Sequence, residues 1–269
     1  MILRCSARFV EKVWGDEELA KRYHKEGKIG EVWLCSDFPT LKTELFDSRE
    51  HQVSWHDVNE QWGFERFPFL VKHIKATQWL SVQVHPDAEA AKLVGEPWGK
   101  PEIWIFLNGG TIVNGLKKGA LEEIKKGNDD WNSLLNFVEV KAGEAVYIKP
   151  GTVHAMGPGV EVYEFQLTSD MTYRFYDWGR NRKLHFKEAL SVATEHVAKP
   201  FWFEEFSCEH FTLRKRHVDG EFFTDRRGVY LLEDGIFGKW KCDVPTAFVG
   251  ISAEEVKIRG TFFEMGVPS

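Results

Sequence analysis

Apolar and polar residues alternate along much of the chain, and alternation with period two is typical of β-strands. The segments 102–107 and 111–116 look like a hairpin around a turn at residues 108–110. From about His196 onward, strand-like runs and turns again follow one another. The pattern therefore predicts a mainly β protein. Strands are expected at residues 68–76, 79–87, 102–107, 111–116, 145–156 and 159–167.

Helical periodicity is limited to short segments between the strands. The segment 85–94 has Pro86 in its first turn and Gly95 after its end, which are common places for these residues at helix ends. A doubly wound parallel sheet needs regular alternation of strands and helices, which this chain lacks. Many short strands separated by turns indicate a barrel or jelly roll instead. Further helices are expected at residues 120–126, 131–137 and 184–196.

Composition and charge narrow the class of protein. The 269 residues are 43% hydrophobic and 28% charged, as expected of a globular chain with one large or two smaller domains. The net charge of −6 argues against the broad basic surface that nucleic-acid binding needs. No run of about 18 apolar residues exists, and the start MILRCSARFVEKVWG lacks the apolar core of a secretory signal. We therefore expect a cytoplasmic protein that binds neither nucleic acid nor membrane.

The most distinctive local feature is the segment Ser81-Val82-Gln83-Val84-His85. Successive side chains of a strand point to opposite faces, so Ser81, Gln83 and His85 share one face and the two valines share the other. If the valine face packs against protein, the polar face looks into the interior, where unpaired polar groups are costly. A bound metal, a polar ligand or exposure to solvent would each satisfy these groups.

Two other segments carry residue types that bind metals. Glu102 stands at the start of a strongly apolar run, with Lys100 two residues before it, and a solvated surface pair is the plainer interpretation. His154 follows a tight turn at residues 150–151. Two histidines, one carboxylate and an amide oxygen would together suit a borderline divalent ion such as zinc. The spacing of the segments does not by itself identify such a site.

Five motifs occur in order over residues 68–190, namely SVQVHPD, GKPE, PGTVHA, SDMTYRFYDWGR and RKLHFKEAL. With them the chain resembles the type I phosphomannose isomerases, the zinc-dependent mannose-6-phosphate isomerases of the cupin superfamily. Each motif is short, but together they are specific. The resemblance implies a mainly β fold, a cupin (jelly-roll) barrel with helical insertions and an abbreviated second β lobe. We expect residues 1–195 to form the metal-binding catalytic region and residues 196–269 to form the strand-rich second lobe.

The resemblance also implies the metal ligands. In that family the metal is held by the glutamine and histidine of the first motif, the glutamate of the second and the histidine of the third. On this chain these positions are Gln83, His85, Glu102 and His154. They are the same residues that the strand-face argument brings together. We therefore expect one zinc ion per chain as the cofactor.

Substrate-binding positions follow from the same resemblance. The serine and lysine of the first two motifs, here Ser81 and Lys100, are associated in the family with the substrate or its phosphate. A basic residue after the catalytic arginine corresponds to Arg180. We expect these side chains to bind a small-molecule hexose phosphate, since an acidic protein needs a local basic cluster to attract an anion.

The catalytic residues implied by the resemblance are Glu164, Arg174 and Lys100. Glu164 is the candidate general base for a carbon-bound proton, with His85 or a zinc-bound water as a competitor. Arg174 would stabilise the negative charge that develops on the substrate. The expected reaction interconverts mannose 6-phosphate and fructose 6-phosphate by proton transfer through an enediolate.

Two other interpretations stay open at this point. The same site could isomerise another hexose phosphate, because the sequence does not reveal which side chains read the orientation of each hydroxyl. Alternatively, the chain is a non-catalytic or regulatory sugar-phosphate-binding cupin, which predicts a broken ligand set or a missing arginine. The full ligand set, Glu164 and Arg174 are all present. The sequence gives no indication of the oligomeric state.

Overall fold

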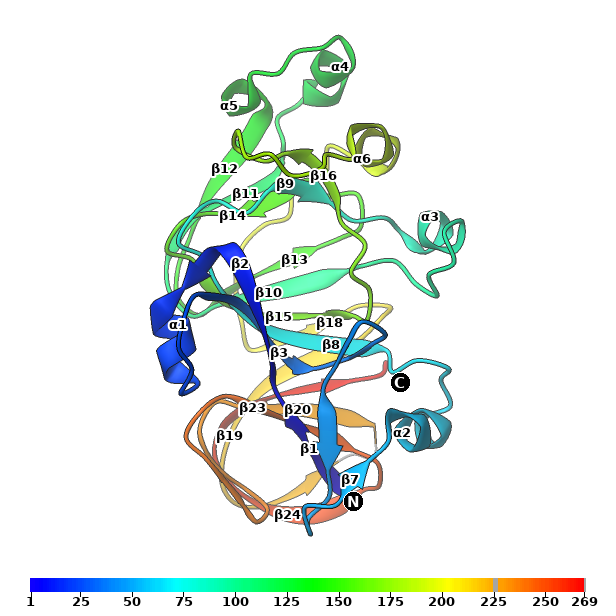
Figure 1. Ribbon diagram of the computed structural model, residues 1–269, viewed down its shortest axis with the longest axis vertical. Helices are drawn as coiled ribbons and strands as arrows, with labels where there is room; N and C mark the ends of the chain where they lie inside the picture. The colour runs from blue at the N-terminus through cyan, green and yellow to red at the C-terminus, as the bar shows by residue number, and fades with distance from the viewer. Residues whose placement is uncertain (225–226, 269) are drawn as a thin grey trace.

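Three β-sheets are stacked along the long axis of the computed structural model, which describes residues 1–224 and 227–268 (Figure 1). We name them the upper, middle and lower sheets after their positions in Figure 1. The upper sheet has five strands, the middle sheet seven and the lower sheet ten. The chain is therefore mainly β, as the alternation of apolar and polar residues predicts.

In hydrogen-bonding order, the upper sheet consists of β12 (Leu135–Val140), β11 (Gly110–Leu116), β14 (His154–Met156), β9 (Val82–Val84) and β16 (Tyr173–Tyr176). The middle sheet consists of β17 (Phe201–Trp202), β13 (Glu144–Ile148), β10 (Glu102–Phe106), β15 (Glu161–Leu167), β8 (Phe69–Lys75), β3 (Ile29–Cys35) and β2 (Arg8–Asp16). The main path of the lower sheet consists of β18 (Glu205–Ser207), β19 (Thr212–Thr224), β24 (Glu254–Gly266), β20 (Gly228–Leu232), β23 (Thr246–Gly250), β1 (Ile2–Ser6), β6 (Glu44–Phe46) and β7 (Gln52–Val53).

The shorter elements complete the chain. The lower sheet also includes β21 (Gly235–Phe237) and β22 (Trp240–Cys242), while β4 (Asp37–Phe38) pairs with β5 (Leu41–Lys42). The helices are α1 (Glu17–Arg22), α2 (Trp55–Trp62), α3 (Ala88–Lys92), α4 (Ala120–Lys125), α5 (Trp131–Leu134) and α6 (Phe186–Val192). Helices α4, α5 and α6 lie over the outer side of the upper sheet (Figure 1). No helix within residues 1–224 and 227–268 is long and apolar enough to cross a membrane.

The upper and middle sheets face each other as a jelly-roll sandwich with helical insertions. Consecutive strands cross between the two sheets: β10 pairs with β13 and β15, whereas β11 pairs with β12 and β14. The expected hairpin of residues 102–107 with 111–116 is therefore wrong, because the turn between them carries the chain from one sheet to the other. Among the described residues no strand pairing joins the two sheets, so they form a sandwich without a continuous hydrogen-bonded barrel.

The helices are shorter than the periodicity predicts. Helix α5 ends at Leu134, and the expected helix over residues 131–137 is wrong in its second half, where β12 begins. Phe137 and Val138 lie in β12 opposite Val113 and Ile112 of β11. Aromatic and β-branched residues favour a strand once a partner strand is available, so tertiary pairing decides the conformation of this segment.

The middle sheet is buried on both faces, and its alternation sends different residues to each side. In β15, Tyr163 and Phe165 belong to the apolar core between the middle and lower sheets, whereas Glu164 points to the opposite face. In β8, Val71 belongs to that lower core and Ile74 to the core between the upper and middle sheets. The middle sheet therefore serves as the floor of the upper sandwich and the roof of the lower lobe.

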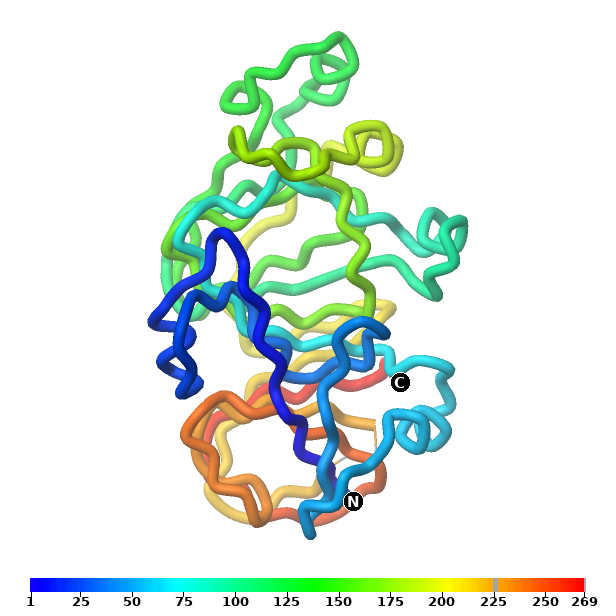
Figure 2. Tube along the Cα trace, viewed as in Figure 1, coloured from blue at the N-terminus to red at the C-terminus, as the bar shows by residue number. Residues whose placement is uncertain are grey.

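The lower sheet combines the first strand of the chain with its last strands. β1 pairs with β23 and with β6, and Figure 2 shows the N-terminal trace running beside C-terminal segments. The division of the chain at residue 195 stays a prediction, and residues 225–226 and 269 of its second part lie outside the described residues. We propose that the second lobe also includes β1, β6 and β7, because these strands extend the C-terminal sheet.

Candidate active site

The upper sheet places three of the expected site residues in one row. Gln83 of β9 lies opposite His154 of β14 on one side and opposite Arg174 of β16 on the other. Residues directly opposite each other in antiparallel strands project from the same face. His85 follows the end of β9 and is two residues beyond Gln83, so the register alone brings these side chains to the inner face of the sandwich.

A second row crosses the facing surface of the middle sheet. Glu164 of β15 lies between Trp104 of β10 and Lys72 of β8. Glu102 precedes Trp104 by two residues and therefore shares its face. The two rows meet in the interior of the sandwich, where Glu102, Glu164 and Lys72 are almost completely buried.

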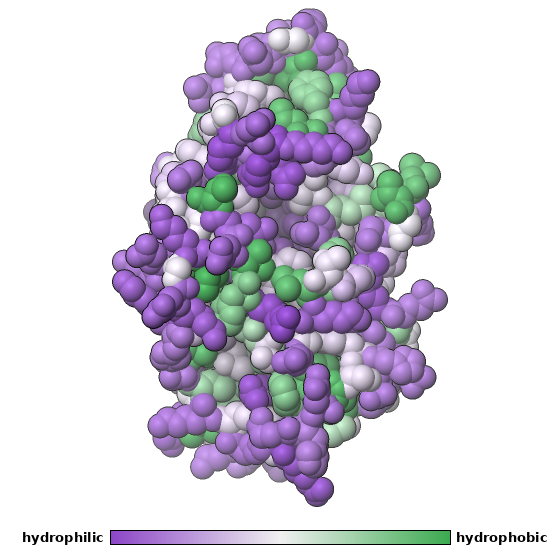
Figure 3. Space-filling view, in the orientation of Figure 1, coloured by the Kyte–Doolittle hydropathy of each residue, from purple (hydrophilic) through white to green (hydrophobic). Residues whose placement is uncertain are grey.

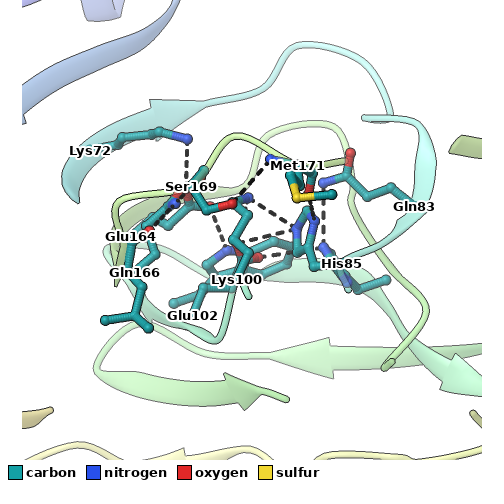
Figure 4. Close-up of polar contacts among 12 residues, drawn as sticks. Lys72, Gln83, His85, Lys100, Glu102, Glu164, Gln166, Ser169 and Met171 are labelled. Carbon is teal, nitrogen blue, oxygen red and sulfur yellow. Dashed lines mark hydrogen bonds and ion pairs between the residues drawn. The ribbon is translucent and has the colours of Figure 1, made fainter. Parts of the chain in front are cut away.

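His85, Glu102 and His154 form a cluster with one potential ligand atom from each residue. These atoms all lie within 4.8 Å of one another, and the side chains are buried. His85 Nε2 is 3.3 Å from Glu102 Oε2, and His154 Nε2 is 3.4 Å from Glu102 Oε1. Figure 4 shows His85 and Glu102 directed toward one another from separate segments of the chain.

Backbone carbonyls fix the tautomers of both histidines. His85 Nδ1 is 2.8 Å from the carbonyl of Met171, and His154 Nδ1 is 2.9 Å from the carbonyl of Thr152. A carbonyl only accepts hydrogen bonds, so each Nδ1 donates and, in a neutral ring, each Nε2 keeps a lone pair as an acceptor. This is how ligating histidines are usually oriented in metal sites. The Nε2 of His85 lies 3.0 Å from Lys100 Nζ, and that of His154 lies 3.3 Å from Gln83 Nε2. Burial lowers the pKa of both side chains, that of His85 to about 4, so both rings are neutral near pH 7.

Glu102 brings a negative charge into this cluster of lone pairs. Neither of its buried oxygens accepts a well-formed hydrogen bond from the described residues, although Lys100 Nζ lies 2.8 Å from Oε2. Burial raises the pKa of Glu102, but the charge of Lys100 and contacts with His85 and His154 outweigh it and hold the pKa well below its ordinary value. A buried carboxylate facing two imidazole lone pairs is stabilised by a cation, and in this structure Lys100 supplies that charge. The donor set of two nitrogens and a carboxylate fits a zinc ion.

Gln83 lies at the edge of this cluster. Its Nε2 is 3.3 Å from His154 Nε2, and its Oε1 accepts a hydrogen bond from Ser81 at 3.2 Å. The strand alternation predicts this proximity of Ser81, Gln83 and His85. The amide nitrogen faces His154, so the amide would have to rotate before its oxygen could coordinate the same ion.

A cavity of about 130 Å³ opens beside the cluster. Figure 3 shows a recess bordered largely by hydrophilic residues at the level of the upper sandwich. The cationic residues that line the cavity outnumber the acidic ones, so its local charge is opposite to the net charge of the chain. Such a cavity suits an anionic ligand. The charged lining residues are Lys12, Lys72, Lys100, Arg174 and Arg182, with Glu31, Glu164 and Asp170.

A chain of alternating charges crosses the cavity floor. Lys72 Nζ lies 3.0 Å from Glu164 Oε1, and Lys12 Nζ lies 3.0 Å from Glu31 Oε1. Burial lowers the pKa of Lys72, but Glu164 and Glu31 outweigh it and raise the pKa above its ordinary value. Burial also raises the pKa of Glu31, but Lys72 and Lys12 outweigh it and bring the pKa to about 2. Glu164 Oε2 accepts a 2.9 Å hydrogen bond from Trp104 Nε1. Lys72 and Trp104 therefore each bind one oxygen of the Glu164 carboxylate.

The arginines near the cavity differ in how they are bound. Arg174 is half-buried, and its Nε has no hydrogen-bond partner among the described residues. Burial and the neighbouring charge of Arg182 lower the pKa of Arg174. Arg182 also lines the cavity, whereas Arg180 does not. The guanidinium of Arg180 instead binds Asp177 and the backbone carbonyl of Trp79.

The chain is similar to known proteins over most of its length. Residues 2–102 match the family described as phosphomannose isomerase type I, catalytic domain. The chain is 32% identical to a mannose-6-phosphate isomerase of Streptococcus mutans, over 87% of this chain and 84% of that relative. The chain belongs to the type I phosphomannose isomerase family. Mannose-6-phosphate isomerase ManA of Bacillus subtilis is 30% identical, over 86% of this chain and 84% of its own.

Solved structures of mannose-6-phosphate isomerases share the whole fold. A structure of the enzyme from Bacillus subtilis has a TM-score of 0.84 at 24% identity, with 99% of each chain covered. A mannose 6-phosphate isomerase described as holo and zinc bound has a TM-score of 0.75 at 17% identity, with 100% of each chain covered. The stack of three sheets is therefore the fold of this isomerase family, including the lower lobe.

Within this phosphomannose isomerase fold, most of the expected site residues come together. Ser81, Gln83, Lys100, Glu164 and Arg174 line the cavity, beside the cluster of His85, Glu102 and His154. Arg180 belongs to neither group, because its guanidinium binds Asp177 instead. The roles assigned to all of these residues stay predictions.

Sequence reasoning missed other residues of the cavity. Lys72 lies in the middle of the largely apolar run PFLVKHIKA, whose other lysine is near its end, and a buried lysine in this position is a signal for a buried site. Glu31 interrupts the apolar segment GEVWLCS in a similar way. Arg182 gives no such signal, because it belongs to the charged run RNRK, which reads as solvated surface. Only the path of the chain after β16 brings it to the cavity.

Proposed function

We propose that this protein isomerises mannose 6-phosphate and fructose 6-phosphate with one zinc ion per chain. The observation that carries the proposal is the convergence of two Nε2 lone pairs on the buried carboxylate of Glu102, beside a cationic cavity. The named relatives are mannose-6-phosphate isomerases, one of them 32% identical over most of the chain. A complete donor set argues against the interpretation of a regulatory cupin without turnover.

The metal would be held by His85, Glu102 and His154, with the amide oxygen of Gln83 as fourth ligand after rotation. One solved relative is described as zinc bound. When bound, a zinc ion would supply Lewis-acid chemistry that polarises the carbonyl of the sugar. Lys100, whose Nζ lies 3.0 Å from His85 Nε2, would then turn its ammonium group to the substrate.

Proton transfer is assigned to Glu164. In the direction of ketose formation, Glu164 takes the proton from C2, the C–H electron pair forms the C1=C2 bond, and the carbonyl pair of C1 moves to O1 to give an enediolate. The proton returns to C1 as the C2=O2 carbonyl forms, and the proton of the O2 hydroxyl passes to O1. Lys72 holds the Glu164 carboxylate in place, because its ammonium group lies 3.0 Å from Glu164 Oε1. His85 is a weaker candidate, because its Nδ1 already donates to the carbonyl of Met171 and its Nε2 faces Glu102.

The remaining side chains bind and stabilise the anion. Arg174 would stabilise the enediolate charge, since its guanidinium has no carboxylate partner among the described residues. Ser81 and Lys100 would bind substrate oxygens near the metal. For the phosphate group, the position of Arg182 in the cavity wall favours it over Arg180, the residue expected from the sequence. The substrate is thus a hexose phosphate, held by charge at one end and by the metal at the other.

The proposal is tested by metal content and activity measured on the same preparations. We expect about one zinc ion per purified chain, loss of mannose 6-phosphate isomerisation on chelation, and recovery when zinc is restored. Glu102→Gln keeps the shape of the side chain but removes its charge, so it should lower zinc affinity by more than the about 10- to 100-fold typical of lost outer partners. His154→Ala should have the same effect.

His56→Ala is the matched control, because the side chain of His56 is 78% exposed and pairs with the exposed Glu60. Its zinc content and turnover should equal those of the unmodified protein. Undiminished turnover in a preparation free of metal would overturn the metal role. Turnover of another hexose phosphate but not of mannose 6-phosphate would overturn the substrate assignment and leave the metal role intact.

A further inference from the structure

The turn between β16 and α6 is held in an unusual conformation. Trp178 has φ of 54° and Gly179 has φ of 77°, so two successive residues adopt the left-handed region. A bulky residue such as tryptophan rarely occupies this region, and its presence indicates a constraint from the surroundings. Trp178 Nε1 donates to the carbonyl of Leu80 at 2.6 Å, and Arg180 Nη2 donates to the carbonyl of Trp79 at 2.7 Å. Both bonds fasten the turn to the segment that enters β9.

Asp177 lies at the centre of this turn and is 2% exposed. Its Oδ1 accepts hydrogen bonds from Arg180 Nε at 3.2 Å and from Arg180 Nη2 at 2.7 Å. Its Oδ2 accepts from Arg182 Nε at 2.7 Å, and Oδ1 also accepts from Arg182 Nη2. Burial raises the pKa of Asp177, but the bonds from the two arginines outweigh it and lower the pKa. One carboxylate therefore holds two guanidinium groups, which leaves the cluster with a net positive charge.

The two arginines face different surroundings. Arg180 binds Asp177 and the Trp79 carbonyl, and it does not line the cavity. Arg182 binds Asp177 by the edge that carries Nε and Nη2, and its guanidinium carbon lies 5.0 Å from the ring centroid of Trp14. Its Nη1 has no hydrogen-bond partner in the described part of the chain, and the residue lines the cavity. Asp177 thus binds one edge of the Arg182 guanidinium and Trp14 packs against its face. The remaining N–H donors of the guanidinium are available to a ligand.

We propose that Asp177 is a positioning residue that presents Arg182 to the phosphate group of the substrate. A free arginine side chain loses much rotamer freedom when it binds an anion. Here the hydrogen bonds to Asp177 and the contact with Trp14 impose that order before the ligand arrives, which increases affinity. Arg174 contributes a second guanidinium on the same cavity. The identity of the phosphate-bearing sugar rests on the proposed function, whereas the capture of a phosphate group does not.

The test measures phosphate binding apart from turnover. Inorganic phosphate is titrated into the zinc-loaded protein by calorimetry, and it is also used as a competitive inhibitor of mannose 6-phosphate isomerisation. Asp177→Asn keeps the size of the side chain but removes the charge that holds Arg182. We expect it to weaken phosphate binding and to raise KM, each by about 10-fold, which corresponds to about 1.4 kcal/mol. The value of kcat should change by less than about 3-fold. The phosphate group is bound equally in the ground state and the transition state, so weaker phosphate binding raises KM and leaves kcat nearly unchanged.

A double variant separates positioning from a general structural role. Arg182→Ala should weaken phosphate binding at least as much as Asp177→Asn, and the combination should be no worse than Arg182→Ala alone. Asp219→Asn is the matched control, because Asp219 is an exposed partner of Arg259 in the lower sheet. It removes the same charge and should leave phosphate affinity unchanged.

Several results would overturn the proposal. These are unchanged phosphate affinity in Arg182→Ala, additive effects in the double variant, or a loss of kcat with unchanged KM in Asp177→Asn. If Asp177→Asn does not fold, Arg182→Ala still decides whether this guanidinium binds phosphate, and Asp177→Glu repeats the cycle with the charge retained. Failure of the unmodified protein to isomerise mannose 6-phosphate would contradict the proposed function alone, because the calorimetric titration does not depend on turnover.

Discussion

Each imidazole of the candidate metal centre is oriented by a single backbone carbonyl. The carbonyls of Met171 and Thr152 accept the protons of His85 Nδ1 and His154 Nδ1, and this directs both Nε2 lone pairs to Glu102. Lys100 supplies a positive charge in the same place, 2.8 Å from the carboxylate. At the residue scale the site therefore brings together two imidazole lone pairs, one carboxylate and one buried ammonium group.

Arg174 provides a prediction at this scale. Its guanidinium is half-buried without a carboxylate partner among the described residues, so Arg174→Ala removes charge from the cavity without breaking an ion pair. Loss of one preorganised donor typically costs about 100- to 1,000-fold in kcat, and we expect a decrease of that size with zinc content unchanged. Steady-state kinetics and metal analysis on the same preparation check this. Loss of zinc or of folded protein would instead give Arg174 a structural role.

The sequence is informative about residues that stand in a regular pattern. The alternation in SVQVH places Ser81, Gln83 and His85 on one face, and the structure has these side chains at the cavity or the cluster beside it. The contributions of Asp177 and Arg182 could not be predicted in this way. Their arrangement depends on a turn with two left-handed residues, and such a turn has no periodicity to read.

At the scale of the secondary-structure elements, the alternation of apolar and polar residues does not show which sheet a strand joins. Pairing between strands that are distant in sequence decides this. β10 and β11 are neighbours in sequence but belong to different sheets. The apolar residues of both strands are buried on either arrangement, so periodicity cannot distinguish a hairpin from a crossover. The crossover matters for the candidate site, because it leaves Glu102 in the middle sheet and places β11 in the upper sheet, where β11 pairs with β14 and its His154.

β8 carries an ionisable side chain on each face, and one of them allows a prediction of how stability depends on pH. Lys72 faces the cavity, whereas His73 faces the lower core, where Nδ1 is 2.9 Å from the hydroxyl of Tyr23 and Nε2 is 2.8 Å from Glu161 Oε1. Burial lowers the pKa of His73, despite the opposing effect of Glu161. The unfolded chain therefore takes up a proton first as the pH falls. The stability contributed by neutral His73 is complete above about pH 6.5 and is lost progressively below it.

We expect the free energy of unfolding to decrease between pH 7 and pH 5, and to decrease less in His73→Gln. The difference in slope should be at most about 1.4 kcal/mol per pH unit for one proton. Urea denaturation at several pH values measures it. His217→Gln, an exposed histidine of β19, is the control and should keep the original slope. Identical slopes for the unmodified protein and His73→Gln would contradict the prediction.

At the scale of the whole molecule, the middle sheet is shared by two cores. Its upper face carries the cavity, and its lower face packs against the lower sheet through a cluster of aromatic rings. The ring of Phe263 in β24 lies 5.6 Å from that of Tyr163, 5.7 Å from that of Phe165 and 6.0 Å from that of Phe203, measured between centroids. Tyr163 and Phe165 flank Glu164 in β15, so the lower lobe supports the strand that carries the candidate base.

Phe263→Ala should therefore destabilise the protein as one unit. Phe263 is 1% exposed, and loss of a buried phenylalanine typically costs about 3–5 kcal/mol. We expect a single unfolding transition that coincides by tryptophan fluorescence and circular dichroism. Phe223→Ala is the control, because Phe223 is 69% exposed in the same sheet and should change stability by less than about 0.5 kcal/mol. Two separate transitions would mean that the lobes unfold independently.

The overall architecture could be predicted only in part from the chain. Alternating runs and turns indicate a mainly β jelly roll, and the family motifs indicate a second lobe. The partners of the first strand could not be inferred, because β1 reads as any other half-buried strand and its ladder with β23 spans almost the whole sequence. The position of such a strand is set by the completed sheet rather than by its own residues.

The pairing of β1 with β23 has a consequence for synthesis on the ribosome. β1 ends at Ser6 and β23 begins at Thr246, so almost the whole polypeptide is made before the two can meet. At about 5–20 residues per second, the delay is roughly 10 to 50 seconds. During that interval the edge of β1 that later pairs with β23 has no partner strand. We expect a chaperone that binds the nascent protein to bind first at such an exposed edge.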